Sequence, residues 1–261
     1  MDKISKLIAV LSLLFNSFVY ADEFQFVDST FCPFVCDPNA EGKEGFVIEI
    51  LRDALATEDH TINFTIVPYK RALSLVRNGE AHALPAIYSE DAPDLTVGKS
   101  VIGIGNNHFF VRHDSEWKYT SIDSWQHITI GVVDGYTFSH PQFDRYLAKQ
   151  KNALNSKVVF ISGGNNYRRL LTLLISGRVD AILDDSAYIQ YELQRLHAEN
   201  SLSSMPPIIS VGALSKGQHV VAYSPKHPEI AKMLMSIIDP FVIELYETGK
   251  IDVYLSRYGI D

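Results

Sequence analysis

The sequence lacks several features on which whole classes of protein depend. Beyond its N-terminal segment it has no apolar run long enough to cross a membrane, no low-complexity segment and no long linker. Its 23 Lys and Arg residues are outnumbered by 31 Asp and Glu residues, and the formal net charge is -8. An acidic chain of this kind is a poor candidate for binding nucleic acid or anionic lipid. With 261 residues it is too long for one small domain and too short for three.

Cysteine is scarce, and its spacing limits its roles. Cys32 and Cys36 have no His or further Cys near them in the sequence, which argues against a metal site. Their Cys-x-x-x-Cys spacing also differs from the Cys-x-x-Cys spacing of redox pairs. Pro33 lies between them and favours an extended or turning chain over a helix. In an oxidising compartment the pair is therefore predicted to close a small structural disulfide.

The N-terminus has the features of a cleaved signal peptide. Lys3 and Lys6 give a positive start, and Leu7–Leu14 is a short apolar run. Val19 and Ala21 occupy the -3 and -1 positions of a signal peptidase site. We expect cleavage after residue 21 and an exported, soluble mature protein. An uncleaved N-terminal anchor is the alternative.

The chain contains one pattern twice, at Arg71–Leu84 and again at Arg169–Ile182. In each copy, apolar residues at helical spacing predict a helix. Each helix ends in a glycine, Gly79 or Gly177, because glycine readily takes the left-handed conformation that follows a helix. A short buried strand comes next in both copies. A helix–glycine–strand unit in each half predicts two similar α/β lobes, and small ligands commonly bind in the cleft between such lobes.

Further strands and helices alternate along the chain, which is typical of α/β proteins. Strands are predicted at 23–27, 61–67, 101–112, 125–133, 157–161, 205–213 and 219–223. Helices are predicted at 46–55, 141–149, 188–196, 228–238, 241–245 and 251–258. The predicted fold class is therefore α/β.

Five short motifs follow one another along the mature chain. They are Gly45-Phe-Val-Ile-Glu-Ile, Pro68-Tyr-Lys-Arg-Ala-Leu, Ile130-Gly-Val-Val-Asp-Gly-Tyr-Thr, Gly177-Arg-Val-Asp-Ala and Gly249-Lys-Ile. In this order and spacing the set resembles the family 3 extracellular solute-binding proteins, the periplasmic receptors of polar amino acid ABC importers. The resemblance covers the whole mature chain. It implies the type II periplasmic-binding-protein fold, in which two α/β lobes are joined by two hinge strands and close on a ligand.

The resemblance also implies a division of the chain and a function. Residues 1–21 would be the signal peptide, 22–107 and 214–261 lobe 1, and 108–213 an inserted lobe 2. The hinges are expected near Asn106–Arg112 and Gly212–His219. The implied protein is a monomer in the periplasm that captures a small polar, amine-bearing, amino-acid-like solute. It hands this solute to an ABC permease in the inner membrane, and it is expected to need no cofactor, to bind no metal and not to be an enzyme.

In lobe 1 the resemblance implies ligand contacts from Asp28, Phe31 and Tyr69. Asp28 and Phe31 lie in the loop after the first predicted strand, and Tyr69 lies just before the first repeat helix. A carboxylate and an aromatic ring face both favour a solute ammonium. The alternative is that Phe31 and the nearby Phe34 only pack within the loop; Phe31 is the preferred ligand residue of the two.

In lobe 2 the resemblance implies contacts from Thr137 and Asp185. Thr137 lies just before a predicted helix, whose first backbone N–H groups can hold a carboxylate; a plain helix cap is the alternative. Asp185 follows the second repeat strand and is expected at the solute's amino group, with a solvated turn as the alternative. Asp180 is interpreted as structural, because His82 occupies its place in the first copy.

The sequence departs from the family at one position that matters for the ligand. Amino acid receptors of this family carry Thr-x-x-Arg after the first repeat, and the Arg pairs with the α-carboxylate; here Asp94 falls at that place. A carboxylate cannot make the bidentate contact. Either Arg71 supplies the cation, or the solute is not a standard α-amino acid. A cation in the first turn of a helix opposes the helix dipole, which favours a functional over a solvated role for Arg71.

Two other functions are compatible with the implied fold. Cyclohexadienyl dehydratases share it and need an acid–base residue in the cleft, for which Asp185 or Glu90 could serve, although no nucleophile–base set is visible. Domains of this kind also deliver ligands to signalling kinases, which would make the protein a sensor.

Overall fold

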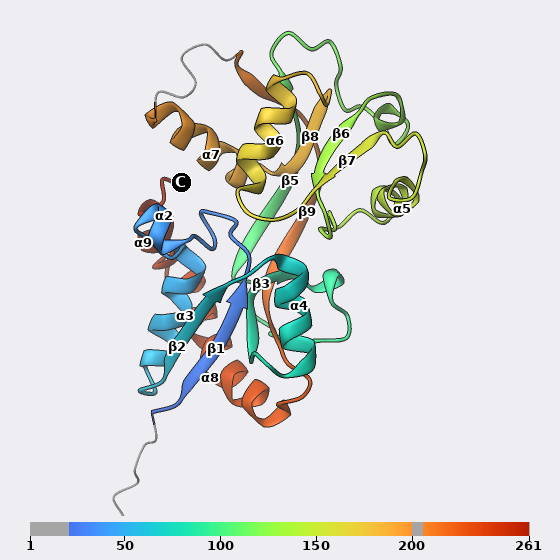
Figure 1. Ribbon diagram of the computed structural model, residues 1–261. Coiled ribbons are helices and arrows are strands. Elements are labelled where there is room, and N and C mark those ends of the chain that lie inside the picture. The colour runs from blue at the N-terminus through green and yellow to red at the C-terminus, as the bar shows by residue number, and fades with distance from the viewer. Residues whose placement is uncertain (1–20, 200–205, 261) are drawn as a thin grey trace, which may run out of the picture.

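A single mixed sheet runs through the whole molecule (Figure 1). The computed structural model describes residues 21–199 and 206–260, so the predicted signal peptide lies outside the described residues except for its last position. The elements, in chain order, are β1 (Glu23–Asp28), α2 (Pro38–Glu41), α3 (Phe46–Ala56), β2 (Thr61–Ile66), α4 (Tyr69–Asn78), β3 (Ala83–Tyr88), the 3₁₀ helix η1 (Ser89–Asp91), β4 (Thr96–Val97), β5 (Gly103–Arg112), the 3₁₀ helix η2 (Ser124–His127), β6 (Ile130–Val133), α5 (Pro141–Gln150), β7 (Val158–Ile161), α6 (Asn166–Ile175), β8 (Ala181–Asp185), α7 (Ser186–Ala198), β9 (Ile208–Tyr223), α8 (Pro228–Glu247) and α9 (Ile251–Ser256). None of the helices in this described part is long and apolar enough to cross a membrane.

The strand order divides the sheet into two similar halves. The order is β2-β1-β3-β9-β5-β8-β6-β7, with β4 also paired to β9. In the first half β1 pairs in parallel with β2 and β3, and in the second β6 pairs in parallel with β7 and β8. Parallel strands require crossover connections, which the helices between them provide. The predicted pair of α/β lobes is therefore confirmed.

Two long antiparallel strands connect the halves. β5 and β9 pair from Gly103 opposite His219 to Arg112 opposite Ile208, and Figure 1 shows both running from one half of the molecule into the other. The predicted hinge segments lie within this ladder, where Asn106 pairs with Lys216. The lobe boundaries predicted at 107/108 and 213/214 fall inside these two strands and stay a prediction.

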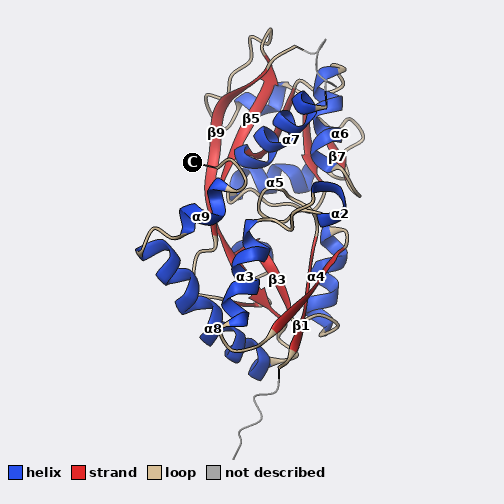
Figure 2. Ribbon diagram, turned by 90° about the vertical axis from the view of Figure 1, so that its left-hand side faces the viewer, coloured by secondary structure: helices blue, strands red, loops and turns tan. Residues whose placement is uncertain are grey.

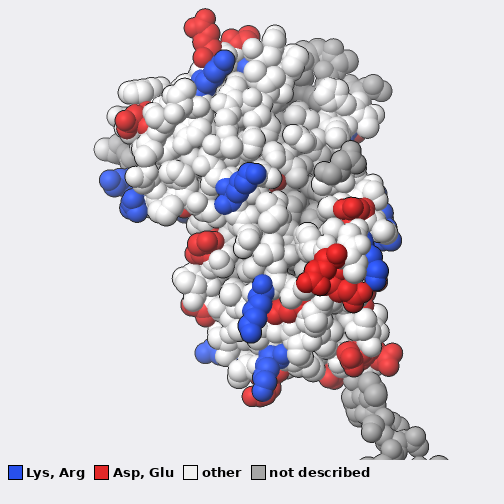
Figure 3. Space-filling model, turned by 180° about the vertical axis from the view of Figure 1, so that it is seen from behind, with Lys and Arg blue, Asp and Glu red and all other residues white. Residues whose placement is uncertain are grey.

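Helices cover both faces of the sheet in the first half. Figure 2 shows α3 and α8 on one face and α4 on the other. The alternation of β1 explains this arrangement, because Phe24 and Phe26 pack in the cluster that contains α3 and α8, whereas Val27 packs in the cluster that contains α4. Among the charged side chains drawn in Figure 3, the Lys and Arg residues are scattered and form no continuous patch on the face shown.

The repeated unit forms the same structure in both halves. Gly79 and Gly177 have φ of 80° and 68°, as expected for the left-handed residue after a helix. The Nδ1 atom of His82 accepts a hydrogen bond from the backbone N–H of Gln25 at 2.8 Å, and the carboxylate of Asp180 accepts one from Thr129 at 2.7 Å. The two side chains thus bind the neighbouring strand in equivalent ways, which supports the structural interpretation of Asp180.

Five predicted elements, three strands and two helices, are wrong in extent. The strands at 205–213 and 219–223 form one strand, β9, because β5 provides hydrogen-bonding partners across the glycine-containing segment between them. The helices at 228–238 and 241–245 form one helix, α8; Pro240 removes one backbone donor, but Ile238 and Val242 on either side of it are buried. Trp125 lies in η2 rather than in a strand, and its 1% exposed ring packs edge-on against Phe143 with centroids 4.9 Å apart.

The predicted disulfide is confirmed. Cys32 and Cys36 are bonded, with their Cα atoms 4.6 Å apart. We expect denaturing thiol titration of the unreduced protein to detect no free thiol, and the Cys32→Ser/Cys36→Ser double variant to unfold with a free energy lower by about 2 kcal/mol, the loop-entropy value for so small a ring. Two free thiols per exported chain would contradict the pairing.

Candidate functional site

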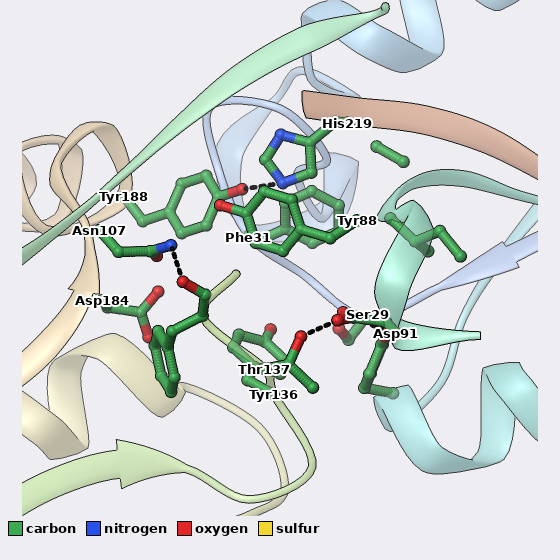
Figure 4. A pocket seen from close by; sticks show the side chains of 14 residues that line it. Ser29, Phe31, Tyr88, Asp91, Asn107, Tyr136, Thr137, Asp184, Tyr188 and His219 are labelled. Carbon is green, nitrogen blue, oxygen red and sulfur yellow. Dashed lines mark hydrogen bonds between the residues drawn. The ribbon is translucent and has the colours of Figure 1, made fainter. Parts of the chain in front are cut away.

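A cavity lies where the two halves of the sheet meet, and both halves line it (Figure 4). About 410 Å³ of space free of protein atoms lies within its lining, including solvent at its open side. The lining residues are Ser29, Phe31, Tyr69, Ala86, Ile87, Tyr88, Asp91, Asn107, Tyr136, Thr137, Phe138, Asp184, Tyr188 and His219. Most of them lie at or just beyond the carboxyl ends of parallel strands or on the two connecting strands, the usual place for ligands in α/β sheets.

Aromatic rings form most of the cavity wall. Tyr88 stacks on His219 with ring centroids 4.4 Å apart and an interplanar angle of 19°. Phe31 meets Tyr188 edge-on at 5.5 Å. Phe31 and Tyr88 belong to the first half of the molecule, whereas Tyr188 on α7 belongs to the second. The aromatic wall is therefore complete only when the two halves are close together. Tyr188 also contacts Nε2 of His219 through its hydroxyl at 3.2 Å, and burial lowers the pKa of His219 to about 3.

Carboxylates provide the charge of the cavity. Asp91 and Asp184 line it, whereas the lining residues include no Lys or Arg among those that the structure describes. Asp91 accepts hydrogen bonds from the hydroxyls of Tyr69, at 3.0 Å, and of Thr137. In Figure 4 Asp91 and Asp184 lie on opposite sides of Thr137.

Several contacts tie the two halves together around the cavity. Thr137 on the β6–α5 loop donates to Asp91 on η1, and Lys70 at the start of α4 pairs with Asp134 after β6. On the other side of the cavity, Arg195 of α7 pairs with Glu41 of α2. The described conformation is therefore one in which the two halves are closed on each other.

Three of the predicted ligand residues lie together in the cavity. Phe31, Tyr69 and Thr137 all contribute to its lining. Phe34 does not; its ring packs against Phe46 with centroids 4.6 Å apart. The preference for Phe31 over Phe34 as a cavity residue therefore agrees with the structure, and contact with a solute stays a prediction.

The other three predicted residues have different surroundings. Asp28 is fully buried beneath the cavity, next to the lining residue Ser29, whose backbone N–H donates to it at 2.7 Å. Arg71 is exposed on the first turn of α4 and does not line the cavity. Asp185 is 2% exposed and binds backbone: Ala187 N–H donates to it at 2.8 Å, and Asn106 N–H donates to its other oxygen.

Sequence reasoning missed several cavity residues. Asp184 precedes the predicted Asp185, and because side chains alternate along a strand, a register error of one residue exchanges the two faces. Asp91 was missed because the sequence predicts a strand at 81–84 after the first repeat helix, whereas the buried strand continues to Tyr88. His219 lies on β9 and would have been found only by assigning that strand to the cleft.

Asp91 has an environment that makes it sensitive to pH. The pKa of Asp91 is raised to about 7, and burial is the largest cause. Hydrogen bonds from Thr137 and Tyr69 lower this pKa, and the neighbouring carboxylates of Asp144 and Glu90 raise it. An aspartate in an unfolded chain has a pKa of about 3.9, so the folded state binds this proton more tightly. Asp91 therefore contributes increasing stability as the pH falls from about 7 to about 4.

We expect this contribution to be visible in the Asp91→Asn variant. The unfolding free energy of the wild type minus that of the variant should increase as the pH is lowered from about 8 to about 5, by at most about 1.4 kcal/mol per pH unit. Urea unfolding at several pH values measures it. Asp94→Asn, which removes a carboxylate paired with Arg77 at the surface, is the control and should give a nearly constant difference. A constant difference for Asp91→Asn as well would contradict the assignment.

Solved structures of binding proteins share this architecture. An ancestral arginine-binding protein bound to arginine has a TM-score of 0.68 and 20% identity, covering 91% of this chain and 98% of that chain. An amino acid ABC transporter substrate-binding protein from Streptococcus pneumoniae bound to L-arginine has a TM-score of 0.68 and 16% identity, covering 91% and 94%. The GluR0 ligand-binding core from Nostoc punctiforme in complex with L-glutamate has a TM-score of 0.68 and 14% identity, covering 91% and 100%.

The similarity to these solved structures establishes the fold of the chain. The chain has the two-lobe α/β fold of the periplasmic binding proteins, with two strands joining the lobes, as predicted. No protein-family model and no curated protein matches the sequence. Membership of family 3 therefore stays a prediction.

Proposed function

We propose that this protein is a solute-binding protein, which captures a small polar, amine-bearing solute between its two lobes and delivers it to an ABC importer. In this proposal residues 1–21 direct export and are removed, and the mature protein works as a monomer in the periplasm. The observation that carries the proposal is a small cavity, lined by both halves, in which the buried carboxylate of Asp184 has one oxygen without a hydrogen-bond partner.

The fold and its relatives support this proposal. Of the three solved structures named above, two hold arginine and one holds glutamate. The lining of the cavity comes from segments on both sides of β5 and β9, so a solute there contacts both lobes at once. A ligand drives closure when its contacts are complete only in the closed state.

We propose specific roles for the predicted residues that line the cavity. Phe31 and Tyr69 supply ring surface from lobe 1, and Thr137 supplies a hydroxyl from lobe 2 that already bonds across to Asp91. In this proposal neither Arg71, which is exposed, nor Asp28, which is fully buried, touches the solute, since neither lines the closed cavity.

A binding screen tests the proposed function. The mature protein is heated with amino acids, polyamines, peptides and organic acids in turn, and at least one class should raise the unfolding temperature by mass action. For the solute that does so, calorimetry should show that Phe31→Ala weakens binding. Phe64→Ala is the matched control, because Phe64 lies in β2 outside the cavity. Failure of every class to bind the folded wild type would contradict a receptor function.

The dehydratase alternative has a separate test. Of its two nominated acid–base residues, Asp185 is held by two backbone N–H groups and Glu90 is exposed outside the cavity. The purified protein should leave prephenate and arogenate unchanged. Enzymatic conversion of either compound that disappears in a cavity variant would replace the receptor proposal with catalysis.

A further inference from the structure

The place that would receive a solute carboxylate in lobe 2 is already filled by the protein itself. Phe138 N–H donates to Asp144 at 3.0 Å and His140 N–H donates to the other oxygen of the same carboxylate at 3.3 Å. The Thr137 hydroxyl, beside them, donates to Asp91. Three donors that precede α5 are therefore bound to two aspartates, and a solute carboxylate would have to displace one of these aspartates to reach them.

Among the described residues, no Lys or Arg lines the cavity to pair with a solute carboxylate. The Lys70 side chain pairs with Asp134, and Arg71 is exposed away from the lining. Asp94, which falls where the resemblance to family 3 receptors predicts an Arg, pairs with Arg77 at the surface. A solute carboxylate in the cavity would be buried beside Asp91 and Asp184 without a positive partner, and burying an unpaired charge is costly.

Asp184 is the group best placed to receive a positive charge. It lines the cavity and is 2% exposed; its Oδ1 accepts from Asp185 N–H at 2.8 Å, while its Oδ2 has no partner. Burial, followed by the neighbouring charge of Asp185, raises the pKa of Asp184 well above its usual value. A buried carboxylate in this state is stabilised in its ionised form by a nearby cation.

The rings around the cavity suit a cation as well. Phe31, Tyr88, Tyr136 and Tyr188 contribute aromatic surface to the lining. A cation over an aromatic face gains about 0.5–2 kcal/mol, and more when it is removed from water. Figure 4 shows Asp184 on the same side of the cavity as Tyr188.

We infer that the solute is a small organic cation without a carboxylate group, whose ammonium pairs with Oδ2 of Asp184 and is surrounded by the aromatic wall. This inference rests on the proposed receptor function and names its class of solute. It accounts for the lack of Lys and Arg among the described lining residues, because a solute without a carboxylate needs no such partner.

Matched pairs of amines and their parent amino acids test this inference. The pairs are agmatine and arginine, cadaverine and lysine, and tyramine and tyrosine, which differ only by the carboxylate. Calorimetry on the wild type should show that in at least one pair the amine binds at least about tenfold more tightly than the amino acid, because the amine buries no carboxylate without a positive partner. This comparison needs no variant and does not depend on how a variant folds.

The role of Asp184 is tested with Asp184→Asn, which keeps an oxygen that can accept from Asp185 N–H. The variant should bind the preferred amine about 100-fold more weakly, as expected when one partner of a buried charge pair is lost. Asp94→Asn, at the surface, should bind as the wild type does. A thermal transition of each solute-free variant establishes that it is folded.

The outcomes separate this inference from the receptor function. An amino acid that binds more tightly than its amine, with weaker binding in Phe31→Ala, would overturn the cation inference and leave the receptor function standing. Wild-type amine affinity in folded Asp184→Asn would also overturn it. If no amine, amino acid or other solute of the broad screen binds, both proposals fall.

Discussion

Replacing Asp185 by alanine is expected to lower the unfolding free energy of the solute-free protein by about 2–4 kcal/mol. One oxygen of Asp185 accepts from Ala187 N–H at 2.8 Å and caps α7, and the other accepts from Asn106 N–H on β5. Loss of the cap costs about 1 kcal/mol, and a buried N–H left without a partner costs about 1–3 kcal/mol more. Denaturant unfolding without solute measures the difference.

Asp180→Ala is the matched control for this prediction. Asp180 is an exposed carboxylate on the same repeat unit and accepts one backbone N–H, from Thr129. Its loss should cost about 1 kcal/mol. From the sequence alone, with Asp185 as an exposed cleft residue, we would expect almost no change in the solute-free protein. An Asp185→Ala variant as stable as Asp180→Ala would contradict a structural role for Asp185 and favour an exposed position in the cleft.

A Gly105→Ala variant is expected to bind its solute at least about 30-fold more weakly and to lose about 1–3 kcal/mol of stability. Gly105 and Gly217 lie opposite each other on β5 and β9. A Cβ atom at Gly105 would meet the phenol of Tyr88, with Cζ at 2.9 Å, and Cε1 of His219 at 3.0 Å. These two rings stack and line the cavity, so an added methyl group forces them to move at the binding site.

Gly164→Ala provides the comparison for Gly105→Ala. A Cβ atom at Gly164 would meet nothing within 4 Å, so this variant should keep wild-type affinity and stability. Calorimetry with the solute from the screen and thermal unfolding of each variant give both quantities. Wild-type affinity in Gly105→Ala would mean that the stacked pair of Tyr88 and His219 does not shape the binding site.

The repeated unit explains why so much of the fold could be predicted. Apolar spacing and the terminal glycines identify the helices α4 and α6. In both copies the short apolar run after the glycine identifies the buried strand that follows, β3 or β8. The continuous strand β9 could not be predicted in the same way. Its glycine-containing middle resembles a loop, and only its pairing with β5, distant in sequence, makes it a strand.

The candidate site was harder to predict than the fold, for reasons that are local. Phe31 and Thr137 follow strands whose ends meet at the cleft, so their positions in the sequence indicate the cavity. The choice between Asp184 and Asp185 depends on which face of β8 each side chain takes, and two adjacent acidic residues give no pattern from which to decide. Asp144 binds the donors before α5 through local contacts over four and six residues, but the sequence does not show which way this side chain turns.

The most direct test of the account is a crystal structure of the mature protein with the tightest-binding amine from the matched pairs. We expect the solute in the cavity between Phe31 and Tyr136, with its ammonium about 3 Å from Oδ2 of Asp184 and with Asp144 still bound to the backbone of Phe138 and His140. A solute bound outside this cavity, or one whose charged nitrogen points away from Asp184, would contradict the account.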